Sequence, residues 1–530
     1  MSNTVLAIVY EAYQFNVFFQ LFQKLAGERK YNFIMYSPYY LPNTEQYIQL
    51  CTRDGFHYIY STTKYGGDAG VLDQIDNLSI NLNNICVTKN KSNQFLRTYL
   101  ILKNKFRELA RLPVTRFKKI LLYLLKKLDD LDLYKKITKE ILEFIDYYTD
   151  TSYKINSIID KINPSLLLFT EDVVERDSNI WIKIAQKKGI LSAILSSSTA
   201  TVTEAAETYF NNPHYYFPTH LPLYLQIGLK IFIRKWCFNY RDRKFIRLPL
   251  KQLIAMDLLD LAPKQPYRKF IRLPLKQLIA MDLLDLAPKQ PWTINSGDST
   301  LILVESQFSK DLLVKEGINR RRIKIIGSLK FDSMAPVLND STRYKQELYQ
   351  KYNLNLTKKL ILCAFPPNLP NRLSYDFQNY EDMTKKWIST LQLSDYNVLY
   401  SVHPSGFPDT ANAIRSLDQI VVEEDIANLI PLCDVYLASV SSTIKWARAC
   451  NKLVLDYDCF HFNYRTYEKD PAIIAVKSLN ELKEWITRLN NQSVSKIHDQ
   501  LNPSLHPNYW GIIDGRSLWR INNYIDCLIK

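Results

Sequence analysis

The chain has 530 residues, a net charge of +15 and 35 tyrosines that no motif organises. A chain of this length is too long for one hydrophobic core, so we expect two domains of about 200 residues or more. The composition excludes collagen-like and disordered proteins. The eight cysteines form no C-x-x-C pair, which argues against zinc and thioredoxin chemistry and favours a reducing compartment. We recognise neither a signal peptide nor an apolar run of about 18 residues that could span a membrane.

Strand-like and helical segments alternate in the N-terminal half. The strand-like runs are short and apolar, and they lie at 5–10, 32–36, 56–60, 165–169 and 191–195. Helical patterns between them, including 94–148 and 180–188, imply a parallel sheet. No G-x-G-x-x-G follows the first strand, so the pattern does not indicate a standard dinucleotide site. We expect a Rossmann-like domain at 1–212 with a basic helical insertion at about 89–148.

The middle of the chain, 213–297, is predicted to be a helical, basic linker that contains an exact duplication. The 24 residues of 243–266 recur without change at 268–291. Each copy predicts one helix, with Pro249 in the first turn of the first copy. Such complete identity indicates a very recent duplication or an assembly artefact. Two copies cannot both occupy a place built for one, so we expect the second to protrude or to pack poorly.

The C-terminal half, 298–530, is predicted to be a second α/β domain. Its apolar runs predict strands at 301–305, 322–326, 360–365, 397–402, 419–422, 435–438 and 453–456. Helices separate most of these strands, and an amphipathic helix at 518–529 closes the chain.

Two polar motifs follow strands of this half. His403-Pro404 comes directly after a strand, where open parallel sheets place ligand groups, and a histidine there can donate to a phosphate. Ser441-Ser442-Thr443 follows another strand and opens a helix, where hydroxyls and amides form an anion site. Alone, the first motif is equally a loop histidine and the second is better read as an ordinary helix cap. Together, on strands taken to be neighbours, they predict a nucleotide-phosphate cleft.

Three segments of this half resemble the donor domain of GT-B glycosyltransferases: 425–435, 441–443 and 451–457. The pattern is most similar to bacterial sialyltransferase-like, polysialyltransferase-like, Kdo-transferase-like and CDP-glycerol phosphotransferase-like enzymes of surface carbohydrates. The segment at 322–332 resembles the point after which their second domain begins, and 513–517 resembles their closing helix. The resemblance covers Thr300–Lys530 well and the N-terminal half only by its general layout. It implies that 298–530 binds the donor nucleotide and that 1–212 is the acceptor domain.

The resemblance implies which residues meet the donor. By position they are His403, Pro404, Ser441, Ser442 and Thr443, with Pro366 lining the cleft beside them. UDP-sugar enzymes of this fold place a glutamate early in the helix after the Ser/Thr loop, where it holds the ribose. Here that helix begins Ile444-Lys445-Trp446, without an acid. A CMP- or CDP-linked donor is therefore favoured over a UDP-linked one.

The same resemblance implies an acidic pair in the N-terminal domain that supplies a general base. Glu171-Asp172, at the end of a predicted strand, is the match, although Val173 stands where the family has glycine. Glu11, just past the first strand, is an alternative base. Acids at strand ends also cap helices, so a purely structural role stays open for each of them.

The positive charge is concentrated in two segments. Residues 89–139 hold 15 Lys and Arg against 4 Asp and Glu, and 217–247 hold 7 against 1. Basic amphipathic helices bind anionic lipid, so the protein is expected to be cytoplasmic and able to lie on the inner face of the plasma membrane. A solvated helix face is the competing explanation. No recognition motif accompanies the charge, and we therefore expect no nucleic acid partner.

These observations predict an α/β, GT-B-like fold, with two Rossmann-like domains facing across a cleft. The expected activity is metal-independent and cofactor-free transfer of a sugar from a nucleotide donor, CMP-sugar favoured, to a surface polysaccharide or lipid-linked acceptor. Two alternatives stay open: a CDP-glycerol-type polyol-phosphate transferase, and a non-catalytic paralogue that binds nucleotide or glycan at the membrane. A sugar-nucleotide epimerase is disfavoured, because the carboxylate-rich cleft that it needs is not evident.

Overall fold

The fold is described from a computed structural model of the chain. The structure describes residues 4–26, 31–61, 71, 74–75, 135–172, 176–196, 213, 216–217, 237–240, 243–246, 280–281, 283–284, 286, 295, 298–369, 373–403, 406, 408–439, 441–501, 503 and 505–529. The chain divides into two compact units: Met1–Leu195 with Pro213–Leu301, and Ser196–Asn212 with Ile302–Leu528. Each is described by itself below.

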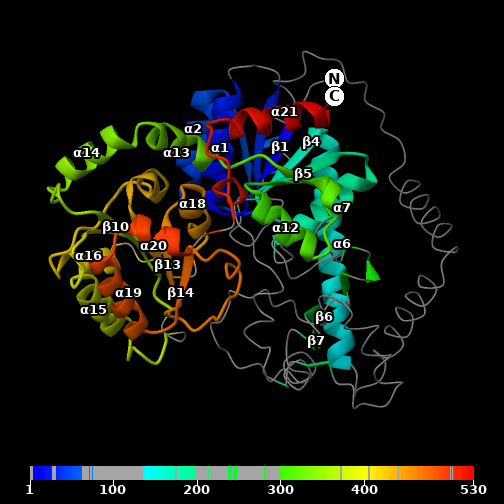
Figure 1. The fold of residues 1–530 in the computed structure, drawn as a ribbon. Coiled ribbons are helices and arrows are strands. Elements are labelled where there is room, and N and C mark those ends of the chain that lie inside the picture. Colours follow the sequence, from blue (N-terminus) through cyan, green and yellow to red (C-terminus); the bar gives the residue numbers. More distant parts are fainter. Residues whose placement is uncertain are drawn as a thin grey trace, which may run out of the picture. The chain divides into compact units, whose positions relative to one another are not determined.

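The first sheet has seven strands in the order β3-β2-β1-β4-β5-β8-β9. Figure 1 labels its central strands β1, β4 and β5. Its strands are β1 (Thr4–Ile8), β2 (Asn32–Ser37), β3 (His57–Tyr60), β4 (Leu166–Phe169), β5 (Leu191–Leu195), β8 (Leu301–Val304) and β9 (Ile323–Ile325). The helices of the first unit are α1 (Ala12–Ala26), α2 (Thr44–Asp54), α6 (Lys135–Ile162) and α7 (Ser178–Lys187). The pairs β1–β2, β2–β3, β1–β4 and β4–β5 are parallel.

The sequence of the first unit explains its packing. β1 and β4 are fully buried, as expected for central parallel strands covered on both faces. Helix α1 buries a stripe of aromatic residues spaced by three and four, the helical period. Phe22 of this stripe stacks on Phe33 of β2 with ring centroids 4.3 Å apart. The aromatic stripe therefore fixes α1 on the sheet and sets where the loop after β1 lies.

The second sheet has five parallel strands in the order β11-β10-β12-β13-β14. Its strands are β10 (Leu360–Phe365), β11 (Asn397–Val402), β12 (Val435–Ala438), β13 (Leu453–Tyr457) and β14 (Ile473–Val476). The helices of the second unit are α12 (Gln307–Lys315), α13 (Leu329–Asn339), α14 (Ser341–Lys351), α15 (Tyr380–Leu391), α16 (Asp409–Arg415), α17 (Ile426–Leu429), α18 (Ile444–Ala449), α19 (Leu479–Asn491), α20 (Val494–Leu501) and α21 (Ser517–Ile529).

Two hydrophobic cores lie on opposite faces of the second sheet. Alternate residues of β10 divide between them: Ile361 and Cys363 pack with α15, α16 and α19, whereas Leu360 and Leu362 pack with α13, α14 and α18. This alternation is the period of two that a β-strand imposes. The second unit is therefore a three-layer α/β/α domain with its loops at the two ends of the sheet.

The segment 213–297 contains a hairpin that the sequence pattern did not predict. Strands β6 (Cys237–Tyr240) and β7 (Arg243–Ile246) pair in antiparallel fashion, and β7 is the beginning of the first copy of the duplication. In the second copy, Ala280, Met281 and Leu286 are buried. Most of the second copy lies outside the described residues, so the expectation that it protrudes or packs poorly stays a prediction. The proposed helix of the first copy lies outside the described residues.

The predicted fold class, α/β with parallel, Rossmann-like sheets in two units, is confirmed. The run at 419–422 forms only an isolated bridge, between Tyr400 and Val421, and β14 was not predicted. Most of the two basic segments, 89–139 and 217–247, lies outside the described residues. Among the helices that the structure describes, none is long and apolar enough to cross a bilayer.

Candidate functional site

Each sheet has a point where the strand order reverses, and ligands of open α/β sheets bind at the carboxyl ends of the strands there. In the first sheet the reversal lies between β1 and β4, and in the second between β10 and β12. The loop after β1 carries Glu11, and the loop after β4 carries Glu171 and Asp172. The sequence-derived acids therefore lie at the switch point of the first sheet.

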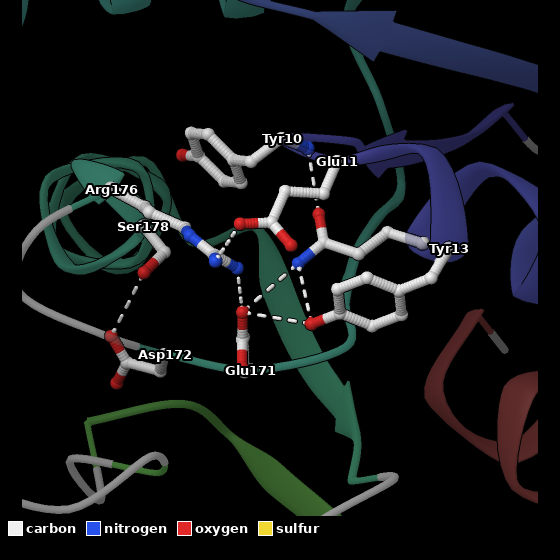
Figure 2. A network of polar contacts seen from close by, with 8 residues as sticks. Tyr10, Glu11, Tyr13, Glu171, Asp172, Arg176 and Ser178 are labelled. Carbon is white, nitrogen blue, oxygen red and sulfur yellow. Dashed lines mark hydrogen bonds and ion pairs between the residues drawn. The ribbon is translucent and has the colours of Figure 1, made fainter. Parts of the chain in front are cut away.

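Arg176 joins two of these acids. Its guanidinium donates through Nη1 to Glu171 Oε1 and through Nη2 to Glu11 Oε1. Figure 2 shows Glu11 and Glu171 meeting the same guanidinium, with Arg176 arriving from the start of α7. The Glu11 side chain is 49% exposed and that of Glu171 is 12% exposed. The two candidate bases from separate loops thus form one charged cluster that is open on the side of Glu11.

Two further donors converge on Glu171. The Tyr13 hydroxyl donates to its Oε1 at 3.0 Å, and Gln14 Nε2 donates to the same oxygen at 3.1 Å (Figure 2). Gln14 is buried, and its Oε1 accepts from the backbone N–H of Tyr10 at 2.6 Å. Gln14 therefore ties the loop after β1 to the loop after β4. Three donors, from Arg176, Tyr13 and Gln14, therefore converge on one carboxylate oxygen of Glu171.

Asp172 lies differently from its neighbour. It is fully buried, and Ser178 Oγ donates to its Oδ1 at 3.4 Å. Its backbone bridges that of Asn295 in parallel fashion. In Figure 2 the Asp172 side chain turns toward Ser178 and away from Arg176. The predicted acidic pair is therefore split: Glu171 belongs to the charged cluster, and Asp172 is part of the interior.

The loops of the second sheet bring together a different set. Pro366 follows β10 and Ser441-Ser442-Thr443 follows β12, so these two loops flank the switch point. His403 follows β11. The expectation that the His403 and Ser441 loops follow neighbouring strands is wrong, because β10 lies between β11 and β12. Pro404 lies outside the described residues.

The backbone of His403 is anchored to the central strand. Its N–H donates to Phe365 O, at the end of β10, at 3.3 Å, and its carbonyl accepts from Gly406 N at 2.8 Å. The Pro366 carbonyl accepts from the Tyr380 hydroxyl at 2.8 Å. These bonds fix the loops after β10 and β11 side by side at the carboxyl edge of the sheet.

The Ser/Thr loop is partly engaged in its own turn. Ser441 Oγ lies 2.7 Å from Thr443 Oγ1 and accepts from Thr443 N at 3.3 Å. Thr443 Oγ1 also contacts the hydroxyl of Tyr436, in β12. Ser442 is exposed, and α18, which follows, has only six residues. The helix contributes little dipole, so the anion-binding capacity of this loop depends on its hydroxyls and amides.

An acid does lie beside α18, although the helix itself has none. Glu305, at the end of β8, pairs with Lys445 Nζ and accepts from Trp446 Nε1 at 3.1 Å. The side chains of Lys445 and Glu305 are 3% and 5% exposed. This buried pair holds α18 in place, and both oxygens of the Glu305 carboxylate are engaged by residues of that helix. No cluster of three or more metal-ligating side chains occurs in the described part of the chain.

Sequence reasoning did not identify Arg176, Gln14 or Tyr13. Arg176 precedes a helix, and Gln14 and Tyr13 lie in the first turn of another, so no motif distinguishes them. The only sequence feature that bears on their position is the alternation of strands and helices, because it implies that the loops after two adjacent parallel strands lie close together.

Comparisons with known proteins concern the fold. No protein-family model matches the chain, and no curated protein matches it. A UDP-GlcNAc 2-epimerase from Neisseria meningitidis, solved with UDP-GlcNAc, is similar over 99% of this chain and 100% of its own, with 10% identity and a TM-score of 0.45. A glycosyltransferase from Rickettsia africae is similar over 100% and 99%, with 12% identity and a TM-score of 0.42. The wall teichoic acid polymerase TagF is similar over 44% and 58%, with 17% identity and a TM-score of 0.33.

Proposed function

We propose that this chain is a glycosyltransferase that moves a sugar from a nucleotide-activated donor to an acceptor hydroxyl. One observation supports the proposal above others. Each of the two parallel sheets carries polar groups at its switch point, with an Arg-bridged carboxylate cluster on the first and a hydroxyl-rich loop on the second. A transferase needs two such edges, one for a proton-accepting acid and one for a phosphate.

The donor phosphate is proposed to bind at the second edge. The exposed Ser442, with the backbone amides of its loop, offers donors to phosphate oxygens. His403, on the loop after β11, is proposed to donate to the phosphate as it departs and gains negative charge. Pro366 lines the same edge. Transfer also requires the two substrates to meet, as facing domains of a GT-B arrangement would allow.

The acceptor is proposed to bind at the first edge, where carboxylates take its proton. The acceptor oxygen attacks the anomeric carbon, and the bond from that carbon to the phosphate oxygen breaks with its electron pair going to the nucleotide. The acceptor proton passes to a carboxylate. Glu171 and Glu11 are open to this edge, whereas Asp172 is buried and bonded to Ser178. We propose a surface glycan or lipid-linked acceptor, on the grounds of the basic segments.

A cytidine nucleotide remains the proposed donor. Helix α18 carries no acid to hold a ribose, and Glu305 beside it is engaged by Lys445 and Trp446. A UDP-sugar is the competing donor, because the similar epimerase structure contains UDP-GlcNAc.

The test is a thermal-shift and turnover panel with CMP, CDP, UMP, UDP and their sugar conjugates. Binding raises the melting temperature by mass action. His403→Ala and Ser442→Ala are expected to weaken the shift for the bound nucleotide by about tenfold or more in affinity. Ser389→Ala is the matched control, because Ser389 is an exposed hydroxyl on α15. Equal nucleotide-induced shifts in melting temperature in all three variants would contradict binding of the phosphate at the second edge.

A sugar-nucleotide epimerase is the second candidate. The carboxylates of Glu11, Glu171 and Asp177, which follow β1 and β4, support this candidate. Product analysis without an acceptor separates the two: an epimerase converts the sugar nucleotide to an isomer of equal mass, whereas a transferase does not. Release of CMP with transfer of glycerol phosphate would instead identify the polyol-phosphate transferase.

A further inference from the structure

Asp177 has an unusual backbone conformation for an aspartate that precedes a helix. It is the N-cap residue of α7, and its backbone is left-handed, with φ +54°. An aspartate at this position ordinarily has extended backbone, and its carboxylate accepts from the first free amides of the helix. Asp177 makes no such capping bond. Strained backbone of this kind persists where surrounding structure enforces it, and it is concentrated at functional sites.

The carboxylate of Asp177 instead accepts from a tyrosine of α6, and its charge acts on two further tyrosines. The Tyr147 hydroxyl, from α6, lies 3.4 Å from Asp177 Oδ2. Tyr10 follows β1 and Tyr39 follows β2, and burial together with the negative charge of Asp177 raises the pKa of both hydroxyls. Burial raises the pKa of Asp177 itself to about 6. Arg176, its chain neighbour, is directed to the two glutamates of the charged cluster.

Tyr10 supplies a second, independent observation. Its side chain is 6% exposed, and its hydroxyl has no hydrogen-bond partner among the residues that the structure describes. A buried hydroxyl without a partner costs free energy, and native structures retain such groups where a ligand or water completes them. Figure 2 shows the Tyr10 hydroxyl on the side of α7, the helix that Asp177 precedes. The Tyr10 and Tyr39 rings lie 6.2 Å apart, so the hydroxyl is set in an aromatic wall.

We propose that Asp177 is the group that accepts the proton of the acceptor hydroxyl, and that the Tyr10 hydroxyl holds the acceptor oxygen beside it. The inference rests on the proposed transferase function. The oxygen–hydrogen bond of the acceptor breaks as its oxygen bonds to the anomeric carbon, the proton goes to Asp177, and the nucleotide leaves with the electron pair. Glu171, which receives hydrogen bonds from Arg176, Tyr13 and Gln14, is committed to binding and orientation.

A group that must take up a proton near neutral pH is most effective when its pKa lies close to the working pH. Asp177 meets this condition, since its raised pKa leaves it ionised above about pH 6 and basic enough to hold a proton during transfer. Asp172 contributes to the same field, because its charge also raises the pKa of Tyr10. The tyrosine hydroxyls stay protonated in this range and act as donors.

The test compares sugar transfer by Asp177→Asn, Asp177→Gly, Glu171→Gln and the control Asp160→Asn. Asn and Gly both adopt left-handed backbone readily, so the two Asp177 variants keep the local fold. Asp160 is an exposed aspartate of α6 that pairs with Lys188. We expect both Asp177 variants to lose about 100-fold or more in kcat at pH 8, with unchanged affinity for the donor nucleotide. We also expect the acid limb of the wild-type kcat profile, centred near pH 6, to disappear from their residual activity and to remain in Glu171→Gln.

The outcomes distinguish the two proposals. An active wild type whose Asp177 variants keep kcat within about threefold, or whose acid limb disappears in Glu171→Gln, would overturn the role of Asp177 and leave the transferase proposal standing. A wild type that binds nucleotide and transfers no sugar to any acceptor would overturn both.

Discussion

Replacing Asp177 by Asn is expected to stabilise the protein above pH 6 while it lowers kcat for transfer about 100-fold or more. The folded chain binds a proton at Asp177 more tightly than the unfolded chain, because burial raises the pKa of this carboxyl from the ordinary 3.8 to about 6. The stability that this carboxyl contributes is therefore fully present below about pH 4 and is lost as the pH rises to about 6. Asn has no proton to lose, so the variant does not suffer this loss.

The size of the effect follows from the same two values. The difference between 3.8 and about 6 corresponds to at most about 3 kcal/mol in the free energy of unfolding at pH 8. A unit of this size gains roughly 2 °C in melting temperature per kcal/mol, so Asp177→Asn is expected to melt about 5 °C higher than the wild type at pH 8. At pH 4 the wild-type carboxyl is neutral, and the two proteins are expected to melt together.

The assay is thermal unfolding of the wild type, Asp177→Asn and Asp160→Asn at pH 4, 6 and 8. The control removes an exposed charge whose side chain is 67% accessible, so its effect should be within about 0.5 kcal/mol at every pH. A variant that melts lower than the wild type at all three pH values would behave as a lost helix cap. That result would refute the reasoning, since it would make Asp177 an ordinary structural residue.

Four further substitutions test other parts of the account. Tyr10→Phe removes a buried hydroxyl without a partner in the described part of the chain, so the melting temperature should be equal or higher while transfer falls about tenfold; a lower melting temperature would reveal a structural bond. Arg176→Met leaves two carboxylates without their shared cation and should lower the free energy of unfolding by about 1–3 kcal/mol in denaturant titrations, and no loss would contradict the bridge. Lys445→Met should cost about 3–5 kcal/mol, and the double variant with Glu305→Met should recover part of it, which a double-mutant cycle measures. His403→Ala should lower kcat for transfer about tenfold or more without changing the melting temperature, and unchanged turnover would exclude His403 from the mechanism.

The strands could be predicted from the sequence because central parallel strands are apolar on both faces. β5, β10 and β11 have the predicted bounds, and β1 and β4 differ from them by a residue or two at their ends. Their order could not be predicted in the same way. β10 lies between β11 and β12, whereas the chain reaches β11 directly from β10 and β12 later. Sequence neighbours need not be sheet neighbours, and the predicted adjacency of His403 and Ser441 failed for that reason.

The candidate site was predictable only where a functional side chain comes soon after a strand in the sequence. Glu171 was identified through the resemblance, as an acid that follows a buried strand, and Glu11 as an acid just past the first strand. Arg176 and Asp177 have no such marker, since they precede a helix in the way that many polar residues do. What distinguishes them is the position of their side chains: Arg176 bonds to two glutamates, and Asp177 accepts from a tyrosine of α6. Which partners these two side chains contact depends on tertiary packing, which the sequence pattern does not specify.

The most direct test of the proposed function is mass-resolved product analysis with the intact chain, a CMP-sugar or UDP-sugar and a panel of glycan and lipid-linked acceptors. We expect an acceptor heavier by one sugar residue, together with free nucleotide in equal amount. Both products should form about tenfold or more slowly with His403→Ala and about 100-fold or more slowly with Asp177→Asn. A donor that is returned unchanged with every acceptor, or that is converted only to its isomer, would contradict the assignment of this chain as a glycosyltransferase.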